Sequence, residues 1–292
     1  RGGLSEATVP FSFHGENLMV EGSVNGVPVS MLIDNGVLWD ELWFYGSGLT
    51  DSLGIAYEET TRVTGAGEGD GVESYTAGGV PISFGDVSFL DQPAIITPED
   101  QGMAALFPGV DGQVCGTFFK NFVVEFDFDR EVLVLHEPGS YVYTDGGELI
   151  EMRRDDSESY SIPVTMETAE GRIVETRLFI DLGGIYPVSL VIDEEAGVLR
   201  PDSDRILLGY GASGPIYGYK WRVGGLRIGG HELRDVVAVF TESPTGADHT
   251  NTTLGLPALR RFNLVFDYFR GVLYVQPNSH FDDRHPGQKS PR

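Results

Sequence analysis

The chain has 292 residues, a formal net charge of −24 and a hydrophobic content of 41%. This length accommodates two domains or one large one, and the acidic balance argues against a nucleic-acid partner, which would require a basic surface. No apolar run reaches the roughly 18–20 residues of a membrane-spanning helix. The single cysteine, Cys115, excludes an intrachain disulfide, and its apolar neighbours predict a buried side chain.

The first half of the chain reads as a series of β hairpins, beginning with two alternating apolar runs around Asn25-Gly26. The second run ends in Met31-Leu32-Ile33-Asp34-Asn35-Gly36, which predicts a buried strand that delivers a carboxylate into a tight turn. Residues 65–71 hold four glycines in seven positions and predict a mobile loop. Val114-Cys115-Gly116 predicts a strand that turns into a short helix, and a hairpin across Asp129-Arg130 closes this half.

The second half repeats this order of features. A hairpin with its turn at Glu170-Gly171 ends in Leu178-Phe179-Ile180-Asp181-Leu182-Gly183, so a second acid stands at a strand end. A second glycine-rich loop follows at residues 209–214, and Thr253-Leu254-Gly255 again turns into a short helix. We predict a first domain over residues 10–137, a linker over 138–159, a second domain over 160–278 and a flexible tail over 279–292.

Matching landmarks recur at a nearly constant spacing. Asp34 and Asp181 are 147 residues apart, Gly116 and Gly255 are 139 apart, and Phe126-Asp127 and Phe266-Asp267 are 140 apart. Several similar offsets indicate an internal duplication, and the scarcity of helical periodicity predicts a mostly β fold. We expect Asp127 and Asp267 to cap turns, because each ends a hairpin strand.

The two strand-end acids, Asp34 and Asp181, are the candidate catalytic residues. If a pseudo-twofold axis relates the halves, these equivalent residues meet near it. Two adjacent carboxylates cannot both ionise, so they share one proton. One then acts as a base toward water while the other donates a hydrogen bond to a carbonyl, which is the chemistry of peptide hydrolysis without a metal.

Taken together, these motifs resemble the retropepsin-like (pepsin-type) aspartic proteases, in a single-chain, two-domain form of bacterial type. The resemblance rests on Asp34-x-Gly36 with Val114-Cys115-Gly116, and on Asp181-x-Gly183 with Thr253-Leu254-Gly255. It implies two pseudo-twofold-related β-barrel domains with a central cleft, a peptide or protein substrate, and no cofactor. It also implies that a monomer suffices, because one chain supplies both acids, and that a bacterial member is exported or periplasmic.

The middle residue of each motif departs from the family pattern, which has Thr or Ser there. Asn35 offers an amide that can replace the hydroxyl in part, whereas Leu182 offers no donor or acceptor. With Gly36 and Gly183, these residues support the dyad in the proposed arrangement. The departure keeps an alternative open: a protease-fold protein that cleaves no peptide and uses the cleft for another acid–base reaction or for an unidentified small ligand.

The glycine-rich loops are candidate covers over the cleft. The residues we assign to them are Gly65, Gly67, Gly69, Gly211, Gly214 and Tyr217. They lack the lysine and helix of a phosphate-binding loop, so no nucleotide is expected. His280, Asp282, Asp283 and His285 carry metal-ligating side chains, but we read them as a solvated tail and predict no metal site.

Overall fold

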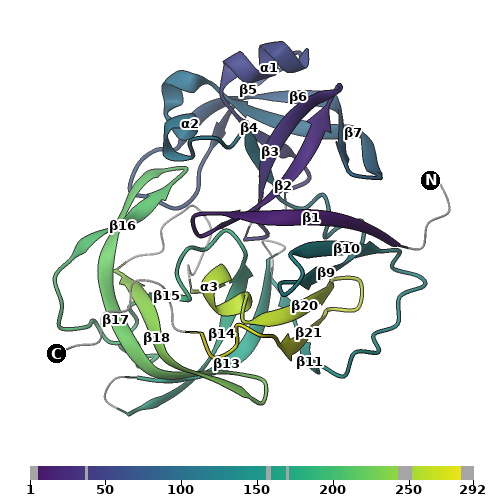
Figure 1. Ribbon diagram of the computed structural model, residues 1–292. Helices are drawn as coiled ribbons and strands as arrows, with labels where there is room; N and C mark the ends of the chain where they lie inside the picture. Colours follow the sequence, from purple (N-terminus) through teal and green to yellow (C-terminus); the bar gives the residue numbers. More distant parts are fainter. Residues whose placement is uncertain (1–5, 37–38, 156–158, 169–170, 243–251, 284–292) are drawn as a thin grey trace.

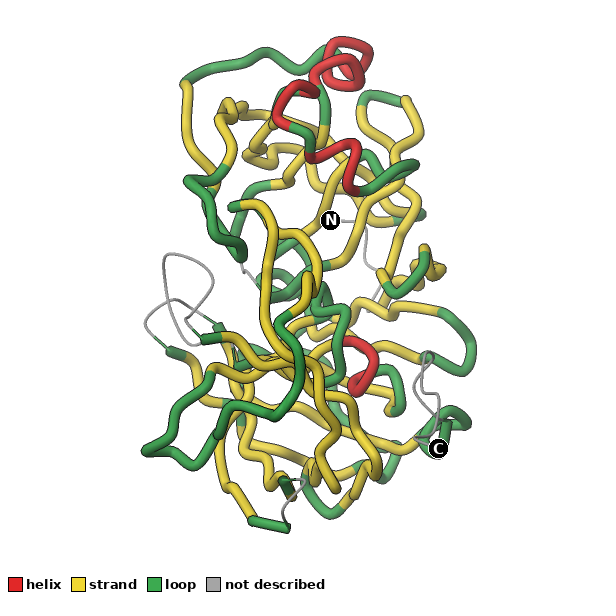
Figure 2. The backbone as a smooth tube through the Cα atoms, turned by 90° about the vertical axis from the view of Figure 1, so that its left-hand side faces the viewer, coloured by secondary structure: helices red, strands yellow, loops and turns green. Residues whose placement is uncertain are grey.

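The computed structural model describes residues 6–36, 39–155, 159–168, 171–242 and 252–283 (Figure 1). Strands dominate these residues and the helices are few and short, so the prediction of a mostly β chain is confirmed (Figure 2). Residues 284–292 of the expected tail lie outside the described residues.

The first half contains ten strands and three short helical segments among its described residues. They are β1 (Glu6–His14), β2 (Asn17–Val24), β3 (Val27–Ile33), β4 (Leu42–Tyr45), α1 (Ser47–Leu53), β5 (Thr60–Val63), β6 (Val72–Phe84), β7 (Val87–Thr97), the 3-10 helix η1 (Glu99–Gln101), α2 (Met103–Leu106), β8 (Gly112–Val114), β9 (Val123–Asp127) and β10 (Val132–His136).

The remaining elements begin inside the expected linker. They are β11 (Glu148–Glu151), β12 (Arg153–Arg154), β13 (Tyr160–Glu167), β14 (Ile173–Asp181), β15 (Val188–Val191), β16 (Ile206–Gly211), β17 (Gly214–Ile228), β18 (His231–Thr241), β19 (Thr253–Gly255), α3 (Leu256–Leu259), β20 (Phe262–Asp267) and β21 (Val272–Pro277). Because β11 pairs with β21 and β12 with β13, the segment 138–159 contributes two strands to the sheets.

Two large sheets organise these strands. The larger has the order β11-β21-β20-β9-β10-β1-β2-β3-β8-β4-β7-β6-β5, and the smaller has the order β12-β13-β14-β19-β15-β18-β17-β16. The first six strands of the larger sheet are symmetric about the β9–β20 pair: each central strand carries its own hairpin partner, and each hairpin is flanked by one further strand. Figure 1 shows this part crossing the middle of the molecule.

Local chemistry explains the hairpins. Asn25 and Gly26 both have positive φ, 50° and 81°, as a two-residue hairpin turn of this twist requires. Asp127 and Asp267 each accept the backbone N–H of the residue three positions on, Arg130 and Arg270, at 3.0 Å. The turn-capping role expected of both acids is therefore present, and it is the same in the two hairpins.

One apolar core runs through both halves. Where β9 and β20 meet, the rings of Phe119 and Phe126 lie edge-on to Phe266, with centroids 5.5 and 5.7 Å apart. Cys115 is fully buried, as predicted. Because the halves share packed aromatic side chains, the strands that carry the two acids are held against a common support.

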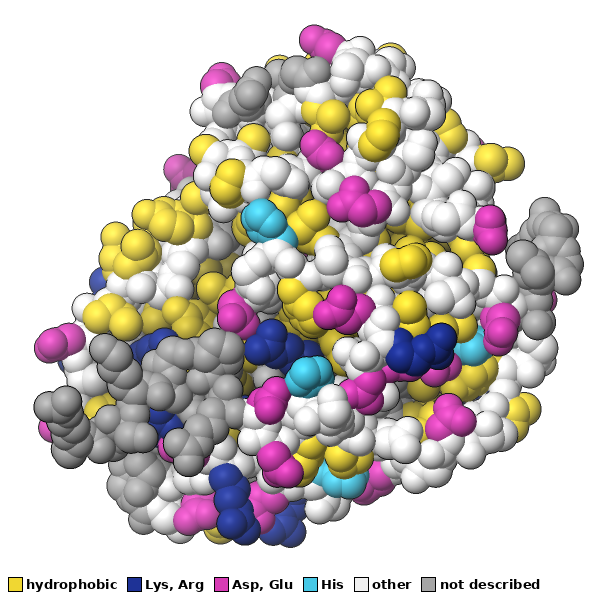
Figure 3. All heavy atoms as spheres, in the orientation of Figure 1, with side chains coloured by type: hydrophobic (Ala, Val, Ile, Leu, Met, Phe, Trp, Pro, Cys, Tyr) yellow, Lys and Arg dark blue, Asp and Glu magenta, His cyan; other side chains and the backbone are white. Residues whose placement is uncertain are grey.

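Apolar side chains also reach the surface near one sheet edge. β16 is the last strand of the smaller sheet, and its Ile206, Leu207 and Tyr210 are exposed. Figure 3 shows hydrophobic side chains gathered at the left of the molecule, where Figure 1 places β16, and carboxylates spread over the rest of this face.

Candidate active site

Equivalent strand pairs deliver the two acids. β3 runs parallel to β8 and leads directly into Asp34, whose backbone N–H donates to the carbonyl of Val114 at 3.0 Å. β14 runs parallel to β19 and ends at Asp181, which pairs with Gly255. Each acid therefore stands at the end of a strand, as the sequence pattern predicts, and each of these strands has a parallel neighbour.

The two acids meet. A Cβ added to Gly36 would lie 2.6 Å from Oδ1 of Asp181 and 3.2 Å from Oδ1 of Asp34. A Cβ added to Gly183 would lie 2.6 Å from Cγ of Asp34. The glycine of each motif thus packs against the acid of the other half, and any larger residue would push the carboxylates apart.

The surroundings disfavour two negative charges. Burial raises the pKa of Asp181 to about 7, with a further contribution from the charge of Asp34, although the backbone N–H groups of Gly183 and Gly184 oppose the shift. Burial also raises the pKa of Asp34, opposed by hydrogen bonds from Gly36 and Gln113. Neither acid residue is fully enclosed, because each is half-buried in the fold.

Asn35 connects the two motifs. Its Oδ1 accepts the backbone N–H of Leu182 at 2.7 Å, and its Nδ2 donates to the hydroxyl of Tyr268 at 2.9 Å. Asn35 and Leu182 are both buried. The Asn35 amide thus bonds across to the loop of the other acid, and Tyr268 is a partner that the sequence reasoning missed.

Burial raises the pKa of Tyr268, so its hydroxyl stays neutral and available as an acceptor. Its ring stacks on Tyr160, with centroids 4.0 Å apart, which fixes its position. At the equivalent place after Asp127 the first half has Phe128, so the hydroxyl exists in one half alone. This difference between matched positions is the signal that could have drawn attention to Tyr268.

The two glycine-rich loops contact each other. Ser213 is the centre of the contact: its Oγ accepts the N–H of Gly65 at 3.2 Å, its carbonyl accepts the N–H of Gly69 at 2.5 Å, and its own N–H donates to Ala66 at 3.0 Å. The N–H of Glu68 donates to the carbonyl of Pro215 at 3.1 Å. The loops come from corresponding hairpins, β5–β6 and β16–β17, so matched tips of the two halves are joined.

Tight backbone approach explains two of the loop glycines. A Cβ on Gly67 would lie 2.5 Å from the carbonyl carbon of Ser213, and its φ of 127° also favours glycine. Gly211 packs against Ala66, and Gly214 has a φ of 97°. Tyr217 lies on β17 beside Arg205, whose guanidinium sits 4.8 Å from the ring centre. Arg205 also pairs with Glu68 of the opposite loop at 2.5 Å.

A polar side chain behind Asp34 was also missed. Gln113 lies on β8 and is buried, and its Nε2 is 3.5 Å from Oδ2 of Asp34. Its Oε1 accepts the hydroxyl of the buried Tyr45 at 2.5 Å. A polar residue within an otherwise apolar strand two positions from Cys115 is the sequence signal that could have found it.

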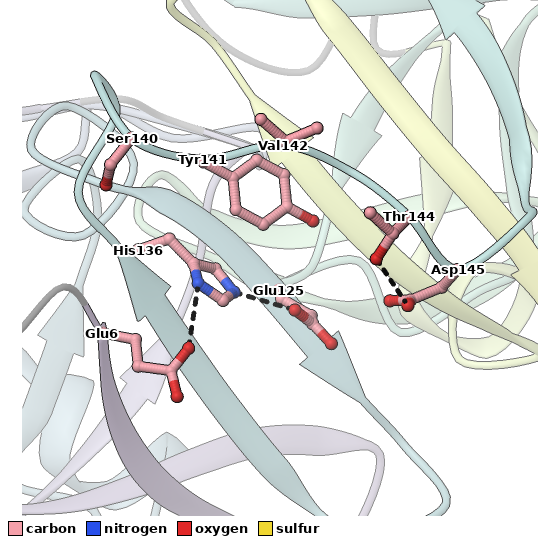
Figure 4. A pocket seen from close by; sticks show the side chains of 8 residues that line it. All are labelled: Glu6, Glu125, His136, Ser140, Tyr141, Val142, Thr144 and Asp145. Carbon is pink, nitrogen blue, oxygen red and sulfur yellow. Dashed lines mark hydrogen bonds and ion pairs between the residues drawn. The ribbon is translucent and has the colours of Figure 1, made fainter.

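A separate hollow of about 280 Å³ contains none of these residues. It is lined by Glu6, Glu125, His136, Ser140, Tyr141, Val142, Thr144 and Asp145 (Figure 4). His136 points between two carboxylates, 2.8 Å from Glu125 and 3.7 Å from Glu6. Across the described ranges, no group of three or more His, Cys, Asp or Glu side chains is arranged to hold a metal ion.

No family model matches the chain, and no curated protein matches it. Within the part of the chain that the structure describes, no helix has the length and apolar character needed to cross a membrane.

Proposed function

We propose that this chain is an aspartic-type peptidase or a close relative, which hydrolyses a peptide bond with water activated by Asp34 and Asp181. The observation that carries the proposal is the convergence of the two carboxylates, each against the glycine of the other motif. Because the pKa of Asp181 is raised to about 7, this acid keeps its proton below neutral pH, and the reactive form of the pair is the one in which the other acid has ionised and a single proton remains.

The proposed reaction follows from that single proton. The ionised carboxylate takes a proton from a water molecule as the water oxygen attacks the carbonyl carbon of the peptide. The protonated carboxyl donates to the carbonyl oxygen, which gives a neutral tetrahedral intermediate. The carboxyl that took the proton of water then donates it to the amide nitrogen, and the C–N bond breaks as the other carboxylate takes a proton from a hydroxyl of the intermediate. The products are an amine and a carboxylic acid, and the dyad again holds one proton.

Several features support a retropepsin-like, duplicated architecture. The strand order around β9 and β20 is symmetric, the turn caps at Asp127 and Asp267 match, and both acids follow strands with parallel partners. In this proposal the hairpin tips around Gly67 and Ser213 are covers that separate when a peptide enters. The substrate is a peptide or protein, and no cofactor is required.

Leu182 favours the alternative, a protein of this architecture that cleaves no peptide. Where Asn35 bonds across the interface through its side chain, Leu182 has no polar atom to return the contact. The brace between the two acid loops is therefore one-sided. Another acid–base reaction, or binding of a small ligand, would tolerate a less constrained dyad than peptide hydrolysis.

A peptide-library digest between pH 3 and pH 8 separates the two. We expect cleavage at acidic pH by the wild type, loss by at least about a hundredfold in Asp34→Asn and in Asp181→Asn, and competition by a statine-type transition-state mimic. Asp86→Asn, at an exposed hairpin turn, is the matched control and should retain activity. Cleavage that survives both dyad substitutions overturns the proposal, and absence of cleavage at every pH favours the alternative.

A further inference from the structure

The amide of Gln113 has all its polar atoms in use, and one of them faces the dyad. Its Nε2 approaches Oδ2 of Asp34 at 3.5 Å and Sγ of Cys115 at 3.2 Å, while its Oε1 accepts from Tyr45. The N–H of Gly36 donates to the other oxygen, Oδ1 of Asp34, at 2.8 Å. Asp34 therefore has a donor at each of its carboxylate oxygens.

Tyr45 determines which way the amide points. The hydroxyl of Tyr45 donates to the amide oxygen at 2.5 Å, and in this arrangement the NH₂ group faces Asp34 and Cys115. Gln113 and Tyr45 are both buried, and rotating the amide would place its oxygen against the carboxylate of Asp34. The Tyr45 hydroxyl and the Asp34 carboxylate together hold the amide in this orientation.

The second half lacks this arrangement. In the sheet register Leu32 pairs with Gln113, and Phe179, two residues before Asp181, pairs with Thr253. Likewise Tyr45 pairs with Thr97, and Val191 takes the corresponding place opposite Thr241. Where the first half has Gln and Tyr, the second has Thr and Val, so Asp181 receives backbone donors instead.

We propose that Gln113, oriented by Tyr45, is a positioning residue that makes Asp34 the ionised member of the dyad and leaves the shared proton on Asp181. A side-chain donor stabilises the charged form of the carboxylate that it faces. The inference rests on the proposed function for its catalytic meaning: Asp34 is then the base toward water, and Asp181 is the donor toward the carbonyl oxygen.

The other titratable groups near the pair stay neutral. Burial, followed by the charge of Asp34, raises the pKa of Cys115, and burial with the charges of Cys115 and Asp34 raises the pKa of Tyr45 well above its ordinary value. The charge of Glu41 also raises the pKa of Cys115, and that of Lys120 lowers it. Burial raises the pKa of both acids; the charge of Asp34 raises that of Asp181 further, whereas the hydrogen bonds from Gly36 and Gln113 oppose the rise at Asp34.

Carboxyl-carbon NMR titration of ¹³C-labelled aspartate tests the assignment, with Asp34→Asn and Asp181→Asn used to identify the two resonances. In the wild type we expect Asp34 to follow the lower step and Asp181 the upper step. Gln113→Met keeps the length and removes the donor, and Tyr45→Phe combined with Gln113→Met avoids leaving the tyrosine hydroxyl without an acceptor. Both should raise the proton affinity of Asp34 about threefold to tenfold, and Tyr45→Phe alone should raise it less.

Thr253→Val is the matched control in the second half and should leave the Asp34 titration unchanged. Equal titration of the two acids in the wild type, or an unchanged Asp34 resonance in both Gln113 variants, overturns the inference. Peptide cleavage measured on the same samples separates the two proposals. A shifted titration without cleavage by the wild type overturns the proposed function and supports the role of Gln113, whereas cleavage with an unshifted titration does the reverse.

Discussion

The loops Asp34-Asn35-Gly36 and Asp181-Leu182-Gly183 follow equivalent strands and place their acids together, yet their side-chain partners differ. The first loop makes several side-chain hydrogen bonds. Asn35 bonds to Leu182 and Tyr268, and Asp34 accepts a hydrogen bond from Gln113. The second loop is apolar at the same places. Leu182 is fully buried, and its backbone N–H is served by the opposite half.

This difference separates what the backbone does from what the side chains do. Parallel strand pairs and the two glycines are enough to bring the acids together, and both halves supply them. The asymmetry lies in the side chains, which can assign different protonation states to two acids in similar backbone settings. Because the backbone is alike in the two halves and the side-chain donors are not, substitutions in the two acid loops should change stability and its pH dependence differently.

The largest expected effect comes from removing the charge of Asp181. Its pKa is raised from 3.8 to about 7 in the folded chain, so the folded state binds more protons than the unfolded state between these values, and stability falls as pH rises through that window. Asp181→Asn removes this penalty. We expect a gain in unfolding free energy of up to about 4 kcal/mol at pH 7 and almost none at pH 4; the residual solvent exposure of Asp181 makes this an upper limit.

Denaturant unfolding at several pH values measures this gain. Asp267→Asn is the control with the opposite sign, because the carboxylate of Asp267 accepts from the N–H and the guanidinium of Arg270 and its loss should destabilise the fold. An Asp181→Asn variant with equal stability gains at pH 4 and pH 7 would contradict the assigned shift.

The next prediction tests the side-chain hydrogen bonds of Asn35, which have no counterpart at Leu182. Asn35→Ala leaves two buried groups, the N–H of Leu182 and the hydroxyl of Tyr268, without their partner, at a cost of about 2–4 kcal/mol in unfolding free energy. Asn35→Thr supplies a hydroxyl that can accept from Leu182 but cannot also serve Tyr268, so it should recover part of the loss. If Asn35→Ala unfolds at the same denaturant concentration as the wild type, the brace contributes nothing.

The mostly β fold, the meeting of Asp34 with Asp181 and the bonding capacity of Asn35 were all predictable from the sequence, because they follow from repeated local patterns. The partners Gln113 and Tyr268 were not. They lie 79 and 233 residues from the side chains they contact, and such contacts depend on strand register and rotamers.

The glycine landmarks also obscured the match between the halves. Gly116 and Gly255 are 139 residues apart, but the flanking strands match at 140. The register places Cys115, not Gly116, at the position of Gly255, and therefore Gln113 at that of Thr253. Aligning the halves on Gly116 and Gly255 is therefore wrong by one residue, and it does not pair Gln113 with Thr253.

Removing the hydroxyl of Tyr268 tests the second hydrogen bond of Asn35, the one that its Nδ2 donates. Tyr268→Phe leaves Nδ2 of Asn35 without an acceptor while keeping the ring stacked on Tyr160, so we expect a loss of about 1–2 kcal/mol. Tyr210→Phe, on an exposed ring, is the control and should change stability little. Thermal unfolding of the two variants at one pH makes the comparison, and a Tyr268→Phe variant as stable as the control would show that water replaces the phenol.

The smallest expected effect concerns the place where the halves are alike, the joined hairpin tips. Glu68 and Arg205 form a half-exposed ion pair across the loops, and such pairs contribute about 0.2–1 kcal/mol. Glu68→Gln should therefore accelerate hydrogen exchange of the amides bonded between the tips, those of Gly65, Gly69 and Ser213, by no more than about fivefold, with a smaller difference at high salt. Glu73→Gln, on a strand outside the contact, is the matched control. A far larger acceleration would mean that the ion pair, rather than the backbone bonds around Ser213, holds the tips together.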